Sequence, residues 1–160
     1  MARRTNEDAD LYWLAKSEPD VYSIDDLRRE GVTLWDGVRN YQARNFLRSM
    51  RVGDRVLFHH SNGDPSGVVG TAVVAGLAQP DSTQFDPRHE GFDEASKRED
   101  PRWCAVKMRF ESRFVVPVTL QMLRADRALS GMRILQRGNR LSVTPVTAAE
   151  FMRVVKLGGS

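Results

Sequence analysis

Residues 34–50 read LWDGVRNYQARNFLRSM, a stretch that starts apolar, turns at Asp36-Gly37 and continues as an amphipathic helix. The apolar positions of this helix recur at i, i+3, i+4 and i+7, which places them on one face: Ala43, Phe46, Leu47 and Met50. Before the helix, Trp35, Arg39 and Asn40 place an aromatic ring, a guanidinium and an amide close together. These groups suit a flat polar ligand, because a ring stacks on its face while donors and acceptors contact its edge. They equally suit a structural role, with the tryptophan in the core and the Arg-Asn pair at a helix cap or on the surface.

A second face of the same predicted helix is basic. Arg44, Arg48 and Arg51 recur at i, i+4 and i+7. A charged face of a helix usually contacts solvent. The functional alternative is a row of contacts to nucleic-acid phosphates, so these three arginines are candidate phosphate-binding residues.

Apolar runs elsewhere predict a sheet with short helices around it. Residues 11–15 (LYWLA) have the composition of a strand buried on both faces, which ends where Lys16, Ser17 and Glu18 emerge before a proline. Further strands are expected at residues 55–60, 68–77, 103–116 and 141–146. Helices are expected at residues 23–30, 119–125, 128–135 and 147–155, the first and last beginning with capping boxes.

This mixture of elements predicts an α+β fold. We expect about five to six strands in a small, curved, partly open β-barrel with short helices packed at its ends. Residues 1–10 are polar and charged, which predicts a flexible N-terminal tail. Residues 11–156 are expected to form a single domain, since a chain of 160 residues favours one domain with a sizeable core.

The composition is that of an ordinary soluble globular protein. Hydrophobic residues make up 41% and charged residues 28%, and the net charge of +3 is compatible with nucleic acid. The single cysteine, Cys104, excludes an internal disulfide and is expected to be a buried, inert thiol. No apolar run approaches the roughly 20 residues of a membrane span, and no signal peptide is recognisable. We therefore expect no membrane partner, a cytoplasmic or nucleoid location in a bacterium, and a monomer.

Motifs that would indicate catalysis are missing. The sequence contains no phosphate-binding glycine loop, no nucleophile elbow and no zinc-spaced Cys/His cluster. His59 and His60 are adjacent, so on a strand they face opposite sides, and no metal site is expected. Asp81 and Asp86 lie in PDSTQFDP, where turn chemistry beside proline explains them better than acid–base catalysis. The sequence therefore favours binding over catalysis, with no cofactor, metal or catalytic residue.

Several short blocks occur in order along the chain. They are YWLAKSEP (12–19), WDGVRNYQARN (35–45), HSN (60–62), GVVG (67–70), PDSTQFDP (80–87) and LSVTPV (141–146). Together they resemble the EVE-domain family, that of the thymocyte nuclear proteins, over nearly the whole chain. The resemblance implies a PUA-like fold, related to modules that bind RNA and to the YTH and SRA readers of modified bases.

The resemblance also implies a pocket that holds a modified base without converting it. Lys16, Ser17 and Glu18 would line this pocket, with Trp35 as an aromatic wall. Edge or phosphate contacts would come from four further residues: Arg39, Asn40, Ser61 and Asn62. Position 59 departs from the family pattern, because it is His where an aromatic residue such as Tyr is expected. The loop at residues 89–101 matches no family block.

Three functions are open on the sequence alone. The first is a non-enzymatic module that reads a modified cytosine or adenine in DNA. The second is a PUA-type RNA-binding module that acts on tRNA or rRNA. The third is a hydrolase of a modified nucleoside or nucleotide that uses Glu18 with Ser17 or Ser61. The aromatic and polar groups around residues 34–50 and the missing catalytic motifs favour the first.

Overall fold

The computed structural model describes residues 11–159, so the tail predicted at residues 1–10 lies outside the described residues. Seven strands form one mixed sheet. They are β1 (Tyr12–Ser17), β2 (Val32–Trp35), β3 (Arg55–His60), β4 (Gly67–Val74), β5 (Gln79–Pro80), β6 (Cys104–Thr119) and β7 (Val143–Val146). Their order is β2-β6-β4-β3-β1-β7, with β5 paired to β6. Only the β1–β3 pair is parallel within the described residues.

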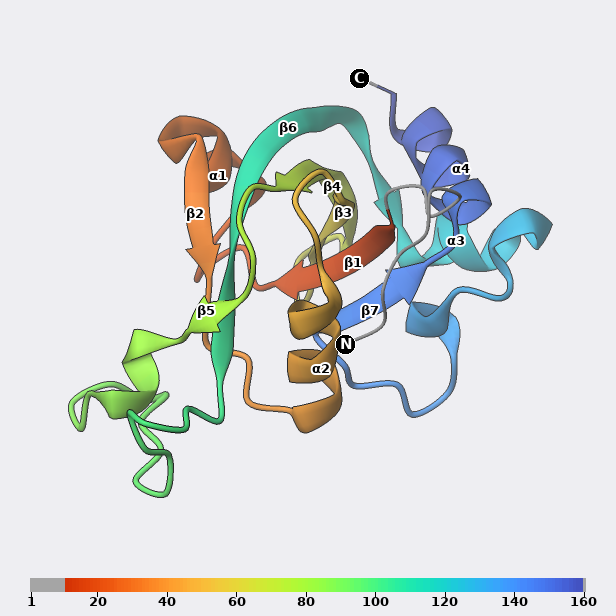
Figure 1. The fold of residues 1–160 in the computed structure, drawn as a ribbon. Helices are drawn as coiled ribbons and strands as arrows, with labels where there is room; N and C mark the ends of the chain where they lie inside the picture. Colours follow the sequence, from red (N-terminus) through yellow and green to blue (C-terminus); the bar gives the residue numbers. More distant parts are fainter. Residues whose placement is uncertain (1–10, 160) are drawn as a thin grey trace.

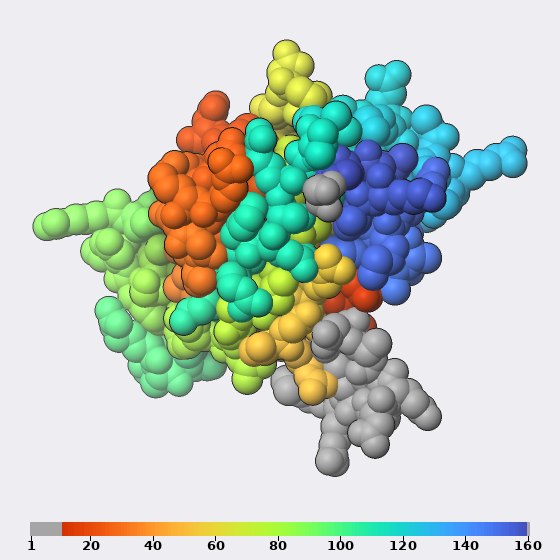
Figure 2. All heavy atoms as spheres, turned by 90° about the horizontal axis from the view of Figure 1, so that it is seen from above, coloured from red at the N-terminus to blue at the C-terminus, as the bar shows by residue number. Residues whose placement is uncertain are grey.

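The sheet curves without closing. Its two ends are β2 and β7, while β6 arches over the other strands (Figure 1). Seen from above, β6 lies across the molecule between β2 on one side and α4 (Ala148–Gly158) on the other (Figure 2). Register shifts in the β3–β4 and β4–β6 pairs produce local bends, as β-bulges do. This arrangement is the predicted α+β fold, an open and curved barrel-like sheet.

Short helices pack around the sheet. Besides α4 they are α1 (Ile24–Glu30), α2 (Tyr41–Ser49), α3 (Leu120–Ala125) and the 3-10 helices η1 (Ser82–Phe85), η2 (Arg127–Leu129) and η3 (Arg133–Leu135). The capping boxes predicted at the starts of α1 and α4 are both present, formed by Ser23 with Asp26 and by Thr147 with Glu150. Such boxes satisfy amide groups that the first helical turn leaves without partners.

Two apolar clusters bury the two faces of the sheet. In β1 the side chains alternate between them, since Trp13 and Ala15 join one cluster and Leu14 joins the other. The first cluster includes Leu47 of α2, and the second includes Phe151 of α4. This alternation confirms the prediction that β1 is buried on both faces.

The largest differences from the expected elements concern β2, β6 and residues 128–135. The strand β2 was not predicted, because four residues with mixed burial give too short a pattern. The strand β6 continues past Pro117. The β4–β6 pairing is interrupted between Arg113 and Val118, so the missing amide of Pro117 costs no hydrogen bond between the strands. Residues 128–135 form parts of η2 and η3 rather than one helix.

Candidate ligand-binding site

A cavity of about 310 Å³ lies between the end of β1 and β2. It is lined by Lys16, Ser17, Val21, Tyr22, Thr33, Leu34, Trp35 and Asp36. These strands are not neighbours in the sheet, because β6, β4 and β3 lie between them in the strand order. The curvature of the sheet therefore creates the cavity, whose volume is typical of sites for small ligands, roughly 300–1,000 Å³.

Trp35 is both a wall of the cavity and part of the core. Its side chain is 8% exposed. The indole packs edge-to-face against the Phe58 ring, with ring centroids 5.3 Å apart. This packing fixes the indole, so the wall is rigid before any ligand arrives. Tyr22 supplies a second ring to the lining, and its hydroxyl donates to Glu30. Burial and Glu30 raise the pKa of Tyr22 to about 12, which keeps this hydroxyl protonated.

Two opposite charges line the same cavity. Lys16 is half-buried, and its ammonium has no hydrogen-bond or ion-pair partner within residues 11–159. Burial lowers the pKa of Lys16. Burial, and next the charge of Asp81, raise the pKa of Asp36. A polar ligand that accepts from Lys16 and donates to Asp36 would satisfy both groups.

The other predicted residues from strand ends lie beside Ser17 and outside the cavity lining. Asn62 donates to the Glu18 carboxylate over 2.6 Å, and the Ser61 amide donates to the Ser17 carbonyl over 3.0 Å. The Ser17 hydroxyl donates to the carbonyl oxygen of Tyr22 over 2.7 Å. The structure therefore brings Glu18, Ser61 and Asn62 beside Ser17, although these three do not line the cavity.

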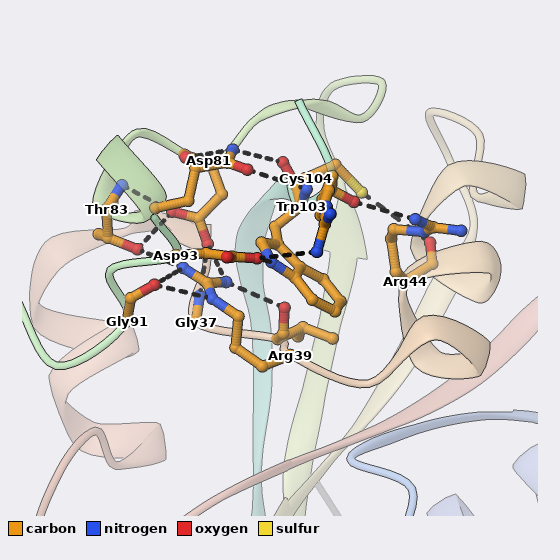
Figure 3. Close-up of polar contacts among 12 residues, drawn as sticks. Gly37, Arg39, Arg44, Asp81, Thr83, Gly91, Asp93, Trp103 and Cys104 are labelled. Atoms are coloured by element: carbon orange, nitrogen blue, oxygen red, sulfur yellow. Dashed lines mark hydrogen bonds and ion pairs between the residues drawn. The ribbon is translucent and has the colours of Figure 1, made fainter. Parts of the chain in front are cut away.

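Arg39 and Asn40 do not line the cavity, and their side chains are engaged within the protein. The Arg39 guanidinium makes five hydrogen bonds, the full complement of its N–H groups, to Val38, Asp81, Thr83 and twice to Gly91 (Figure 3). The Asn40 side chain caps α2 by accepting from the Ala43 amide over 3.0 Å. The Arg39 guanidinium therefore has no free N–H group, and the Asn40 side-chain oxygen is used by the helix cap.

Asp81 holds the turn that follows Trp35, a role beyond the turn chemistry predicted for it. Its side chain is fully buried and accepts from the Gly37 amide over 2.8 Å and from Arg39 over 2.9 Å. It also accepts from the amide of Thr83, the turn chemistry that was predicted. Burial alone would raise the pKa of Asp81, but hydrogen bonds from Thr83, Gly37 and Arg39 lower it overall. The carboxylate thus holds the turn that follows Trp35.

The loop at residues 89–101 contacts Arg39 and Trp103. Asp93 accepts from the Trp103 indole over 2.7 Å, and the Gly91 carbonyl accepts from Arg39 (Figure 3). Trp103 also stacks on Tyr41 at the start of α2, with ring centroids 4.9 Å apart. This loop therefore supports the start of α2.

On the predicted basic face of α2, the Arg44 guanidinium already has partners within the protein, and the face ends before Arg51. Arg44 lies over the Tyr41 ring and donates to Asn45 and to the Arg102 carbonyl. Arg48 lies in the last turn of the helix. Arg51 lies beyond the end of α2 at Ser49, so it does not continue the face.

His59 is buried in the sheet and does not line the cavity. Its side chain is 2% exposed, and neither ring nitrogen has a hydrogen-bond partner in the described part of the chain. Burial, followed by the charges of Lys16 and His60, lowers the pKa of His59 to about 4. The departure from the family pattern at this position therefore leaves the cavity wall intact.

Acid should destabilise the protein through His59. The unfolded chain binds a proton near the ordinary pKa of 6.5, whereas the folded protein does not until about pH 4. The free energy of unfolding should therefore be at its maximum with respect to His59 above pH 6.5 and fall by roughly 3 kcal/mol towards pH 4. Urea unfolding across this range should show the decline in the wild type and its loss in His59→Phe. The control His89→Phe, at an exposed position, should keep the decline in stability. An unchanged decline in His59→Phe would show that another group causes it.

Among residues 11–159, no group of three or more His, Cys, Asp or Glu side chains is arranged to hold a metal ion. In the same part of the chain, every helix is too short or too polar to cross a membrane.

The chain thus has an open, curved, barrel-like α+β fold with a cavity between the end of β1 and β2. The EVE domain family matches residues 11–157, and the chain belongs to this family. Thymocyte nuclear protein 1 from Mus musculus is 39% identical over 165 residues, which cover 91% of this chain and 73% of that protein. The Homo sapiens protein of the same name is 38% identical over 164 residues, with the same shares covered.

Solved structures share the fold. A crystal structure of a Pseudomonas syringae protein has a TM-score of 0.90 at 42% identity and covers 92% of this chain and 99% of that one. Human THYN1, crystallised in complex with DNA that contains 5-methylcytosine, has a TM-score of 0.88 at 36% identity. That match covers 94% of this chain and 99% of the human one.

Proposed function

We propose that this chain binds nucleic acid and holds a modified base in the cavity between β1 and β2, without converting it. The observation that carries the proposal is the half-buried Lys16 ammonium, which has no partner in the described chain and lies in a cavity walled by Trp35. The complex of human THYN1 with 5-methylcytosine DNA supports DNA as the partner and a modified cytosine as the first base to test.

The lining matches the chemistry of a base such as cytosine. A base edge carries acceptor atoms beside an exocyclic amino group, so Lys16 can donate to it while Asp36 accepts from it. Trp35 and Tyr22 supply aromatic surface, and each base–aromatic contact contributes about 1–3 kcal/mol. A base in a duplex reaches such a cavity only by leaving the stack, which costs a few kcal/mol.

The geometry favours binding over hydrolysis. The Ser17 hydroxyl donates to a backbone carbonyl, and the Glu18 carboxylate accepts from Asn62. Neither arrangement activates a serine, since a nucleophile needs a base within hydrogen-bond reach. We therefore assign no catalytic residue.

Lys16→Met should weaken binding to a duplex that contains one 5-methylcytosine. The substitution keeps the length of the side chain and removes the charged donor, whose hydrogen bond contributes about 1.5–3 kcal/mol, so the loss should be roughly tenfold or more. Fluorescence anisotropy with labelled duplexes measures the dissociation constants. The matched control is Lys107→Met, which removes the same charge from an exposed position on β6. Equal losses in both variants would show that Lys16 acts only through net charge.

The same titration tests the proposal itself. Duplexes identical except for one 5-methylcytosine should bind with different affinities, the modified one more tightly. A paired RNA ligand with the same sequence distinguishes the PUA-type RNA-binding alternative, because that module would depend on the 2′-hydroxyl groups. Equal affinities for the modified and unmodified duplexes would contradict base reading.

A further inference from the structure

A second hollow, of about 500 Å³, lies between the start of α2 and the segment that precedes β7. We call it the arginine hollow. It is lined by Asn40, Gln42, Arg133, Gln136, Arg137, Gly138, Asn139, Arg140 and Leu141. Three of these side chains are guanidinium groups and four are amides, and no carboxylate is among them. The lining is therefore cationic and rich in hydrogen-bond donors.

The charge of the arginine hollow is not neutralised by the protein. Within residues 11–159, Arg133, Arg137 and Arg140 pair with no carboxylate. Other arginines of the chain do pair, as Arg39 does with Asp81 at 2.9 Å and Arg153 with Asp126 at 2.7 Å. Guanidinium groups without counter-ions around a concave surface favour an anion, and their planar donors match phosphate oxygens.

The loop that carries these arginines has a defined shape. The Asn139 side chain donates to the Arg133 carbonyl over 2.6 Å and accepts from the Leu141 amide over 2.9 Å. Gly138 has a φ of 80°, a conformation that favours glycine, and it turns the chain between Arg137 and Asn139. The loop is thus closed by its own hydrogen bonds, which reduces the ordering cost of binding.

The arginine hollow lies close to the cavity. Asp36 lines the cavity and Asn40 lines the hollow, and a chain of four peptide units spans at most about 14 Å. The Lys16 amide also donates to the Ser142 carbonyl over 2.8 Å, next to Leu141 of the hollow. Figure 1 shows the segment after β2 and the segment before β7 running along the same edge of the molecule, at the start of α2.

This spacing fits a nucleic-acid strand. Phosphates recur about every 3.4 Å along the axis of one strand of a duplex, so a base in the cavity leaves phosphates of nearby nucleotides within reach of the hollow. The face of α2 is less suited, because the Arg44 guanidinium is already engaged by Asn45 and the Arg102 carbonyl. Contacts to phosphate position a protein on its strand and carry no base preference.

We propose that the arginine hollow binds the phosphodiester backbone of the strand whose base enters the cavity. The inference rests on the proposed function for the identity of that strand. It assigns Arg137 and Arg140 to backbone contacts that leave base discrimination to the cavity.

The test is the double variant Arg137→Ala/Arg140→Ala, titrated by anisotropy against 5-methylcytosine and unmodified duplexes over a series of salt concentrations. Affinity for both duplexes should fall by the same factor, and the slope of log K against log salt should become shallower by about two. The matched control, Arg124→Ala/Arg127→Ala, removes the same charge from exposed positions on α3 and η2 and should leave the slope unchanged. An unchanged slope in the first variant, or an equal change in the control, would overturn the assignment.

Two further arms separate the alternatives. Inorganic phosphate alone, titrated by calorimetry at constant ionic strength, should show no saturable binding to the wild-type protein; saturable binding that the double variant loses would assign the hollow to a small free anion instead. A wild type with no preference for the modified duplex would contradict the proposed base reading alone, because the salt slopes of the variants still decide the role of the hollow.

Discussion

Replacing Asp81 with alanine is expected to lower the free energy of unfolding by about 3–5 kcal/mol, the usual effect of removing one partner of a buried ion pair. The Asp81 side chain is fully buried, and Arg39 and the Gly37 amide would both lose their acceptor. Because hydrogen bonds hold the pKa of Asp81 below its ordinary value, this stability is present above the unfolded pKa and is lost on acidification through the folded pKa. Urea denaturation followed by circular dichroism gives the free energy.

Asp86→Ala is the matched control for this prediction. Asp86 lies in the same PDSTQFDP segment and is exposed, and among the described residues its side chain accepts only from the Arg88 amide. Its loss should change the free energy of unfolding by about 0.5 kcal/mol or less. Comparable effects for the two variants would show that Asp81 acts as a local turn residue and not as the brace for Arg39.

Val21→Trp is expected to abolish the preference for a modified base while leaving stability unchanged. Val21 lines the cavity, yet its side chain is 74% exposed, so an indole there can fill the mouth without disturbing the core. The affinity for the 5-methylcytosine duplex should fall to that for the unmodified duplex, as measured by anisotropy. Thermal unfolding should coincide with that of the wild type.

The control for Val21→Trp is Val52→Trp. Val52 is 59% exposed in the turn between α2 and β3, and it does not line the cavity. This variant adds the same ring and should keep the preference. If Val21→Trp also kept it, the cavity between β1 and β2 would not be the place where the base is read.

The parts of the fold that were predicted from sequence depend on local patterns. The capping boxes join residues three positions apart, and the β1 strand shows as an uninterrupted apolar run. The strand β2 and the order of the sheet depend on pairing between distant segments, as when Trp35 pairs with Val106. One sequence carries no direct sign of such pairing.

The same distinction applies to the site. Lys16, Ser17 and Trp35 meet at one cavity as expected, because a strand end and an apolar turn are recognisable in sequence. The partner of Arg39 lies 42 residues away, so its guanidinium could not be assigned to Asp81. The Asp-x-Thr spacing around Asp81 was a visible signal, but it indicated only the turn that Asp81 also forms.

Fluorescence of a purine analogue placed beside the single 5-methylcytosine of a duplex tests most directly whether a base enters the cavity. The analogue is quenched while its neighbour is stacked, so its signal reports the departure of that neighbour. Saturating wild-type protein should raise the fluorescence, and Val21→Trp should bind without raising it. A wild-type complex that forms with no rise in fluorescence would contradict the account, because the modified base would then have stayed in the stack.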